Sequence, residues 1–226
     1  MKNIIVFVCH DIASVENTLK TDDNAHIIFV GDKPINENIQ NNPYIIIARD
    51  LTHNIEHEKK LLTFTAWYLI VKNNLFSNYD YFTILEYDVT LDKNFKQNLD
   101  NVLISNNYVD VISFNHFMWS FGMHIKLHIC QEFLQPKNIN FMNIYSKINN
   151  NGWYPTTNQC IKKQVLVDFV NWYYPVCLEI KDKDYHYLSW YHERFFSIFI
   201  YHFNLQVKTI SGLSHIGRNS HVNGYN

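Results

Sequence analysis

Apolar and mixed segments alternate along the first half of the chain. Four apolar runs predict short strands at residues 4–8, 26–30, 44–48 and 81–85. The mixed segments between them predict helices at 12–20, with Ser14 as the N-cap, and at 55–75. Strands that are apolar at every position are typical of a parallel sheet covered on both faces. The pattern therefore predicts an α/β fold, with a mixed, mainly parallel central sheet flanked by helices.

The second half has a weaker pattern, and residues 115–151 have no clear periodicity. The remaining segments predict a helix at 92–104, a strand at 109–114, a helix at 164–173 after the segment 159–161, a helix at 187–203 and a strand at 205–210. A polar tail follows. No repeat, linker or break in composition divides the chain. We therefore expect a single domain over residues 1–226.

Polar residues follow each of the four predicted strands of the first half. They are Cys9, His10 and Asp11; Gly31 and Asp32; Arg49 and Asp50; and Glu86, Tyr87 and Asp88. Ligands of parallel sheets gather at the carboxyl ends of the strands. The sequence therefore predicts a binding site at the edge of the sheet where these four segments meet.

Glu86 and Asp88 are the strongest chemical signal at this edge. Residues i and i+2 of an extended chain point to the same side, so both carboxylates can face one site. Hard cations such as Mg²⁺ and Mn²⁺ prefer oxygen ligands and keep positions open for phosphate oxygens. The alternative is a pair of solvated acids in a turn, which is a common use of this short pattern.

Bulk composition limits the classes of function. Apolar residues make up 47% of the chain and the formal net charge is −2, so we expect a folded protein and not a general nucleic-acid binder. No apolar run reaches the ~20 residues of a membrane span, and no secretory signal peptide is visible, so a cytoplasmic location is expected. The four cysteines lack CxxC spacing and are expected to be free, buried thiols.

Residues 81–103, YFTILEYDVTLDKNFKQNLDNVL, resemble the DxD-containing segment of GT-A glycosyltransferases, in which a hydrophobic strand leads into an acidic-x-Asp motif and then a helix. The first Asp of the motif is Glu86 here. The resemblance implies a Rossmann-like nucleotide-sugar-binding fold, with a nucleotide-binding half (1–115) and an acceptor-binding half (116–226). It also implies transfer of a hexose from a UDP- or GDP-sugar to a saccharide or glycan acceptor, with Mn²⁺ or Mg²⁺ as cofactor.

Several residue roles follow from this resemblance. It implies that Asp88 binds the metal, that Glu86 contacts the metal or the ribose, and that His215 is a third ligand, with His221 as second choice. It places the nucleotide near Cys9, His10, Asp32, Arg49 and Tyr87. For two of these residues a purely structural role stays open: Asp32 can close a turn with Gly31, and Asp50 can neutralise Arg49.

The acceptor side of the site is expected in the second half of the chain. The resemblance implies that Glu193 is the general base if the enzyme inverts, with Asp184 and Asp182 as fallbacks. The alternative is an ion pair on the helix surface with Arg194 or nearby lysines. Trp153, Thr157 and Asn158 are the expected sugar or acceptor contacts, since an aromatic ring, a hydroxyl and an amide suit a sugar.

Two other functions stay open. A nucleotidyltransferase acting on sugar phosphates shares a related sheet, but residues 8–12 lack the glycine-rich basic loop that such enzymes usually have after the first strand. A non-catalytic carbohydrate-binding protein is the second alternative, and the presence of Glu86, Asp88 and Glu193 argues against it.

Overall fold

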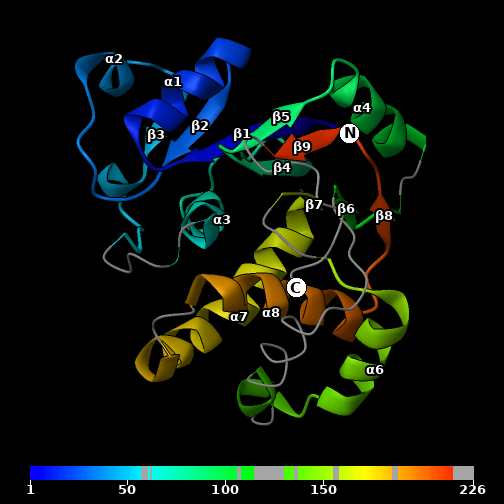
Figure 1. Ribbon diagram of the computed structural model, residues 1–226. Helices are drawn as coiled ribbons and strands as arrows, with labels where there is room; N and C mark the ends of the chain where they lie inside the picture. The colour runs from blue at the N-terminus through cyan, green and yellow to red at the C-terminus, as the bar shows by residue number, and fades with distance from the viewer. Residues whose placement is uncertain are drawn as a thin grey trace.

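The central sheet contains seven strands in the order β3-β2-β1-β4-β7-β6-β8, within the part of the chain that the structure describes (Figure 1). This computed structural model describes residues 1–56, 61, 63–105, 108–114, 130–134, 137–154, 158–184 and 188–215. The strands are β1 (Asn3–Cys9), β2 (His26–Phe29), β3 (Ile45–Ile47), β4 (Tyr81–Glu86), β6 (Val111–Ser113), β7 (Gln159–Lys162) and β8 (Val207–Thr209). The sheet confirms the predicted α/β fold.

Strand direction determines which segments meet at each edge of the sheet. Strands β3, β2, β1 and β4 are parallel neighbours, while β7 runs antiparallel between β4 and β6, and β8 is parallel to β6. The carboxyl ends of β1 to β4 therefore lie at one edge, together with the beginning of β7. We call this edge the strand-end rim. It is the edge at which the sequence predicted a binding site.

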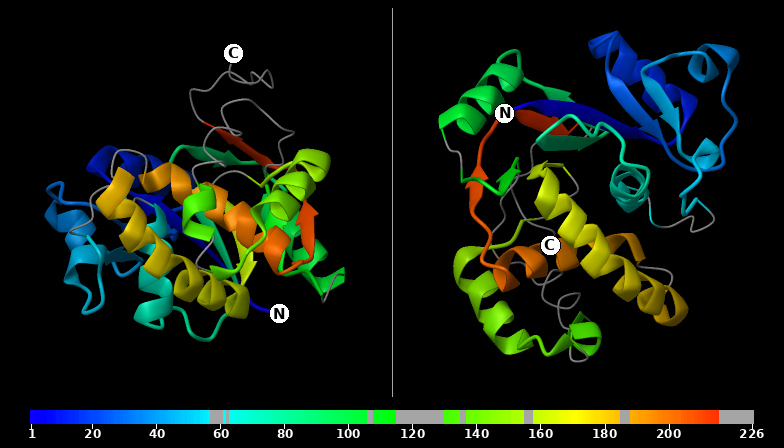
Figure 2. Two further views of the ribbon diagram at one scale, coloured as in Figure 1. Left: turned by 90° about the horizontal axis from the view of Figure 1, so that it is seen from below. Right: turned by 180° about the vertical axis from the view of Figure 1, so that it is seen from behind.

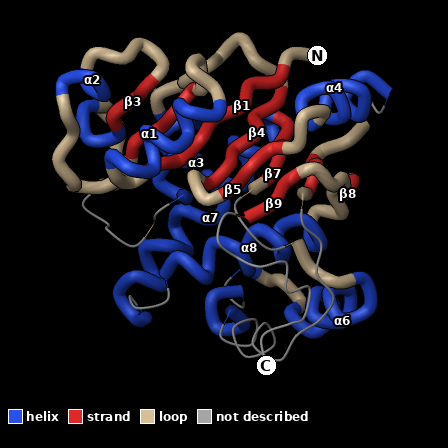
Figure 3. The backbone as a smooth tube through the Cα atoms, turned by 45° about the horizontal axis from the view of Figure 1, so that its top comes forward, coloured by secondary structure: helices blue, strands red, loops and turns tan. Residues whose placement is uncertain are grey.

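A second, two-stranded sheet lies beside this rim. It pairs β5 (Val89–Leu91) with β9 (Leu213–His215) in antiparallel orientation (Figure 3). No strand was predicted in either segment, and the assignment of Leu213–His215 to a polar tail was wrong. Each segment becomes a strand only through pairing with the other.

Helices cover both faces of the central sheet (Figure 2). One face carries α1 (Ile12–Thr21), α2 (Glu37–Gln40) and α4 (Phe95–Ser105); the other carries α3 (Thr63–Lys72), α7 (Lys163–Asp184) and α8 (Leu188–His202), with α6 (Phe141–Asn151) against α8. Along β1, Val6 and Val8 enter one core and Phe7 and Cys9 enter the other. This two-sided burial explains the continuously apolar strands.

Helix boundaries differ from the prediction in several places. Helix α7 runs from Lys163 to Asp184 and not over 164–173 only, and α4 begins at Phe95 and not at residue 92. The N-cap of α1 is Asp11, and Ser14 completes its capping box from the third helical position. Helix α3 begins at Thr63, since Ile55 and Glu56 are not helical and residues 57–60 lie outside the described part. Within 115–151, which was expected to be irregular, α6 is a regular helix whose buried residues Phe141, Ile144 and Ile148 follow a helical period.

The four cysteines are free and buried, as expected. In the described part of the chain, none of the helices combines the length and the apolar character needed to cross a bilayer.

Candidate functional site

The strand-end rim places Glu86 between the two halves of the chain. Glu86 is the last residue of β4 and pairs with Val8 of β1. Its backbone N–H donates to Oδ1 of Asn158, at 2.7 Å, and Asn158 is fully buried just before β7. A buried amide that accepts a backbone N–H holds that backbone in place. Asn158, which the sequence analysis assigned to a sugar contact, therefore anchors the acidic motif through its carbonyl oxygen.

The side chain of Glu86 is oriented by α3. Thr63 is buried at the first position of that helix, and its hydroxyl donates to Oε1 of Glu86 at 3.0 Å. Glu86 itself is half-buried. Its carboxylate is thus fixed at one oxygen by a neutral donor, and it keeps its second oxygen for a ligand.

Asp88 and His215 approach each other through the small sheet. Asp88 is half-buried, with its Oδ1 atom inaccessible to solvent, and it immediately precedes Val89. Val89 pairs directly with His215 across β5 and β9. The backbone of the predicted third ligand therefore lies beside the acidic motif, although the two are far apart in sequence. The side chain of His215 and all of His221 lie outside what the structure describes.

The donor set fits a hard divalent cation. Glu86 and Asp88 supply carboxylate oxygens, the ligands that Mg²⁺ and Mn²⁺ prefer. Among the side chains that are described, no group of three His, Cys, Asp or Glu residues stands close enough to hold one ion. A complete site therefore needs a further ligand, or the oxygens of a bound phosphate.

The loop after β1 packs against the acidic motif. The ring of His10 meets that of Tyr87 edge to face, with their centroids 4.5 Å apart, and Tyr87 is exposed. Asp11 caps α1 and forms an ion pair with Lys33 at 3.1 Å; the backbone N–H of Ser14 is the main cause that lowers the pKa of Asp11 to about 2. His10 and Tyr87 together present an aromatic surface at the rim.

Cys9 lies at the predicted place in the chain but not on the rim surface. Its side chain is fully buried under α1, beside the hydroxyl of Thr18, and burial raises the pKa of the thiol to about 11. Its carbonyl oxygen accepts the N–H of Val30. The thiol is therefore a core group, and the exposed surface at this point belongs to His10.

Asp32 and Arg49 are exposed at the ends of β2 and β3. Gly31, with φ of 98°, turns the chain just before Asp32, which is a conformation that favours glycine. The Arg49 guanidinium donates to the carbonyl of Lys33 at 3.2 Å. Arg49 makes no ion pair with Asp50 in the described structure, so the structure does not show the neutralisation considered above.

Glu56 was not among the predicted site residues. Its half-buried carboxylate accepts the backbone N–H of Gly31, and burial raises the pKa of Glu56, against the opposing effects of that N–H and of Arg49. Glu56 therefore fixes the turn that presents Asp32. In the sequence, the only local indication of this role is that the acidic Glu56 directly follows the apolar Ile55.

Glu193 lies on α8 in an ion pair with a nearly buried arginine. Its Oε2 is 2.7 Å from NH1 of Arg194, whose guanidinium carbon lies 5.1 Å from the ring centroid of Trp153. Arg194 is only 8% exposed, so this pair is not the surface pair that the sequence suggested as an alternative. Thr157 lies outside the described residues, as do the side chains of Asp182 and Asp184.

Helix α8 is connected to the acidic motif through α3. His192, next to Glu193, contacts the ring of Phe64 with centroids 5.1 Å apart, and Phe64 follows Thr63, which holds Glu86. The residue next to the predicted base is thus in contact with the residue next to the one that holds the predicted metal ligand Glu86.

The chain is similar to known proteins in structure but not in sequence. No protein-family model matches the chain, and no curated protein matches it in sequence. The structure is similar to the apo form of the WbbM bifunctional glycosyltransferase, with a TM-score of 0.61 and 13% identity over 96% of this chain and 46% of that one. The chain thus spans a little under half the length of WbbM.

A weaker similarity is to a glycosyltransferase involved in the glycosylation of the major capsid of PBCV-1, with a TM-score of 0.49, 9% identity, and coverage of 97% of this chain and 95% of that one. The similarity to WbbM shows that this chain has an α/β fold found in a glycosyltransferase. In this chain that fold consists of the seven-stranded sheet and the helices on both of its faces, described above.

Proposed function

We propose that this chain is a GT-A-type glycosyltransferase, which transfers a hexose from a nucleotide diphosphate sugar to a saccharide or glycan acceptor with the help of Mn²⁺ or Mg²⁺. The observation that carries the proposal is the acidic pair Glu86 and Asp88 at the end of β4, with His215 brought alongside by β9. The fold shared with WbbM supports it. The donor is a UDP- or GDP-sugar.

In this proposal each rim residue has a distinct task. Asp88 and Glu86 hold the cation, which when bound offsets the negative charge of the departing diphosphate. Thr63 and Asn158 hold Glu86 in one orientation before any ligand arrives. His10 and Tyr87 supply a surface on which a nucleoside can pack, since their rings are joined edge to face at the rim.

The chemical step joins the acceptor hydroxyl oxygen to the anomeric carbon while the bond from that carbon to the diphosphate oxygen breaks. In an inverting reaction Glu193 takes the hydroxyl proton, and Arg194 orients its carboxylate. In a retaining reaction the departing diphosphate oxygen takes the hydroxyl proton, no strong base is needed, and Glu193 then serves only to pair with Arg194.

Nucleotide binding tests the proposal directly. Thermal unfolding is measured with UDP and GDP, each with and without Mn²⁺. We expect one nucleotide to raise the melting temperature only when the metal is present, because a ligand that binds the folded state stabilises it. Asp88→Ala should abolish this response. Asp100→Ala, which removes an exposed carboxylate on α4, is the matched control and should retain it.

The outcomes separate the three functional classes. Absence of any response to UDP or GDP, with or without Mn²⁺, contradicts the proposal. Release of pyrophosphate from a nucleoside triphosphate and a sugar phosphate indicates a nucleotidyltransferase instead. Saccharide binding without nucleotide binding or turnover indicates a carbohydrate-binding protein.

A further inference from the structure

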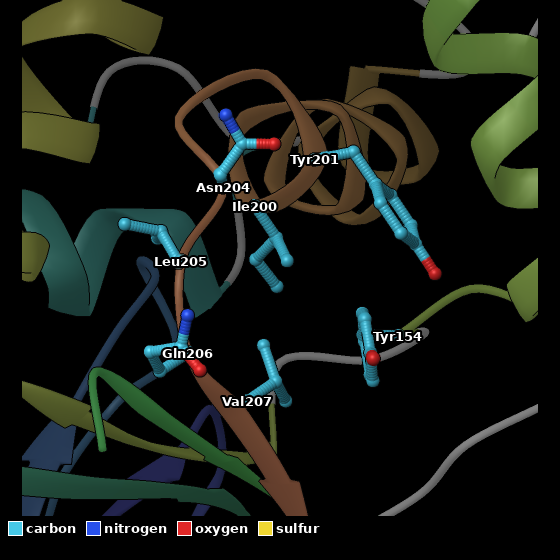
Figure 4. Close-up of a pocket in the computed structure, with 7 residues that line it drawn as sticks. All are labelled: Tyr154, Ile200, Tyr201, Asn204, Leu205, Gln206 and Val207. Carbon is cyan, nitrogen blue, oxygen red and sulfur yellow. The ribbon is translucent and has the colours of Figure 1, made fainter. Parts of the chain in front are cut away.

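A pocket of about 330 Å³ lies between the end of α8 and β8 (Figure 4). Two tyrosines, Tyr154 and Tyr201, form one side of it, and Leu205 and Gln206 lie across from them. The pocket is separate from the strand-end rim: Val207 in its wall aligns through β6 and β7 with Phe82, four residues before Glu86. None of the residues assigned above to nucleotide or metal lines this pocket.

Tyr154 and Tyr201, which we call the aromatic wall of the pocket, are held in fixed positions. The two tyrosine rings stack with centroids 5.9 Å apart and planes inclined by 30°. The hydroxyl of Tyr201 donates to the carbonyl of Gly152 at 2.6 Å. Ser197 clamps the backbone of Tyr154, accepting from its N–H at 3.1 Å and donating to its carbonyl at 3.0 Å. A ligand therefore meets rings that are already in place, and their ordering costs no binding energy.

Two side-chain amides supply the polar part of the pocket. Asn204 has a φ of 51°, and its Oδ1 accepts from Lys147 at 3.0 Å, which leaves its NH₂ group for a ligand. The backbone of Gln206 is bonded to Asp110 and Val111, whereas its side-chain amide bonds to no residue in the described structure. None of the lining side chains that the structure describes carries a charge. The ligand that suits this wall is therefore neutral.

We propose that this pocket binds one neutral pyranose ring of a saccharide. A pyranose offers an apolar C–H face to an aromatic ring and hydroxyl groups to amides, and the volume lies within the range of small-ligand sites. Tyr154 is four residues from Asn158, so their Cα atoms are at most about 14 Å apart. A saccharide held here therefore lies close to the rim. The further claim that this saccharide is the acceptor of transfer rests on the proposed function. The claim that the pocket binds a saccharide does not.

The experiment titrates the full-length chain, without nucleotide or metal, with the methyl pyranosides of glucose, galactose, mannose and N-acetylglucosamine. Backbone amide shifts are followed by NMR. We expect at least one sugar to shift the amides of residues 200–207. Gln206→Ala should weaken this binding about fivefold, the equivalent of one hydrogen bond of about 1 kcal/mol. Gln97→Ala, which removes an exposed glutamine on α4, should leave it unchanged.

Tyr154→Ala tests the aromatic wall and should abolish sugar binding; if this variant does not fold, Gln206→Ala carries the test alone. The proposal is overturned if no sugar shifts these amides, if Gln206→Ala binds as tightly as the unsubstituted chain, or if uridine shifts them and the sugars do not. Since no nucleotide or metal is present, these results are independent of the nucleotide test at the rim. Either proposal can fail while the other stands.

Discussion

His192 gives the protein a pH-dependent stability whose size can be worked out from its surroundings. The side chain is 2% exposed and lies among the rings of Phe64, Trp67, Phe169 and Tyr173, with centroid distances between 4.6 and 5.9 Å. Burial alone lowers the pKa of His192 from 6.5 to about 3. The folded protein therefore holds a neutral imidazole at any pH above about 3.

The sign of the effect follows from proton uptake. Between pH 6.5 and pH 3 the unfolded chain binds a proton at His192 and the folded chain does not. The free energy of unfolding therefore falls as the pH decreases, by about 1.4 kcal/mol per pH unit in the middle of this window. Integration from pH 7 to pH 5 gives a loss of about 2 kcal/mol from this one residue. For a chain of this size that lowers the melting temperature by about 4–8 °C.

The assay is urea unfolding at pH 7 and pH 5, compared between the unsubstituted chain and His192→Phe. Phenylalanine suits the aromatic cluster and cannot take up a proton. Any packing cost of the substitution is the same at both pH values. The loss of unfolding free energy between pH 7 and pH 5 is therefore compared between the two chains, and the difference is the contribution of the imidazole. Phe196→Leu, which alters the same cluster at another fully buried ring, is the control and should keep the original pH dependence. If His192→Phe loses as much stability between pH 7 and pH 5 as the unsubstituted chain, then His192 is not the buried neutral group described above.

Three further predictions concern the rim and α8. Asn158→Ala leaves the N–H of Glu86 without its buried acceptor and should lower the free energy of unfolding by about 1–3 kcal/mol, measured by urea unfolding; a change below about 0.5 kcal/mol would show that the bond is not important. Glu193→Gln should abolish transfer, measured as nucleotide release with acceptor present, while the affinity for the donor stays unchanged; a nearly normal rate excludes Glu193 as the base. Asp11→Ala removes the α1 cap that binds Ser14 and should cost about 1 kcal/mol, whereas Asp23→Ala, at an exposed acid beyond the end of α1, should cost little.

Much of the sheet could be predicted because its signal is local. A run such as 26–30 is apolar at every position after His26, and a strand buried on both faces needs that composition. The position of the strand-end rim could also be predicted, because neighbouring parallel strands place their carboxyl ends at the same edge of the sheet. The small sheet could not be predicted in this way: Thr90 and Ser214 pair across a separation of 124 residues, and neither segment has a strong pattern of its own.

The parts of the site that the sequence analysis missed are contacts between distant polar groups. Glu56 matters because it accepts the N–H of Gly31, 25 residues earlier, and nothing in the surrounding sequence indicates that partner. A surface ion pair with Arg194 was the alternative considered for Glu193. Arg194 is buried because Trp153, from another segment, covers its guanidinium, and a paired guanidinium over an aromatic ring can tolerate such burial.

The acidic motif also joins the two halves into which the chain was divided at residue 115. Strand β7 belongs to the second half, yet it lies between β4 and β6, and it pairs with both. Without it, β4 would be an unprotected edge strand, which is prone to pair with other chains. Glu86 would lose the acceptor of its N–H as well. Residues 1–115 therefore contain Glu86, Asp88 and Thr63, which orients the Glu86 carboxylate, but not Asn158 or β7, so the complete rim needs both halves of the chain.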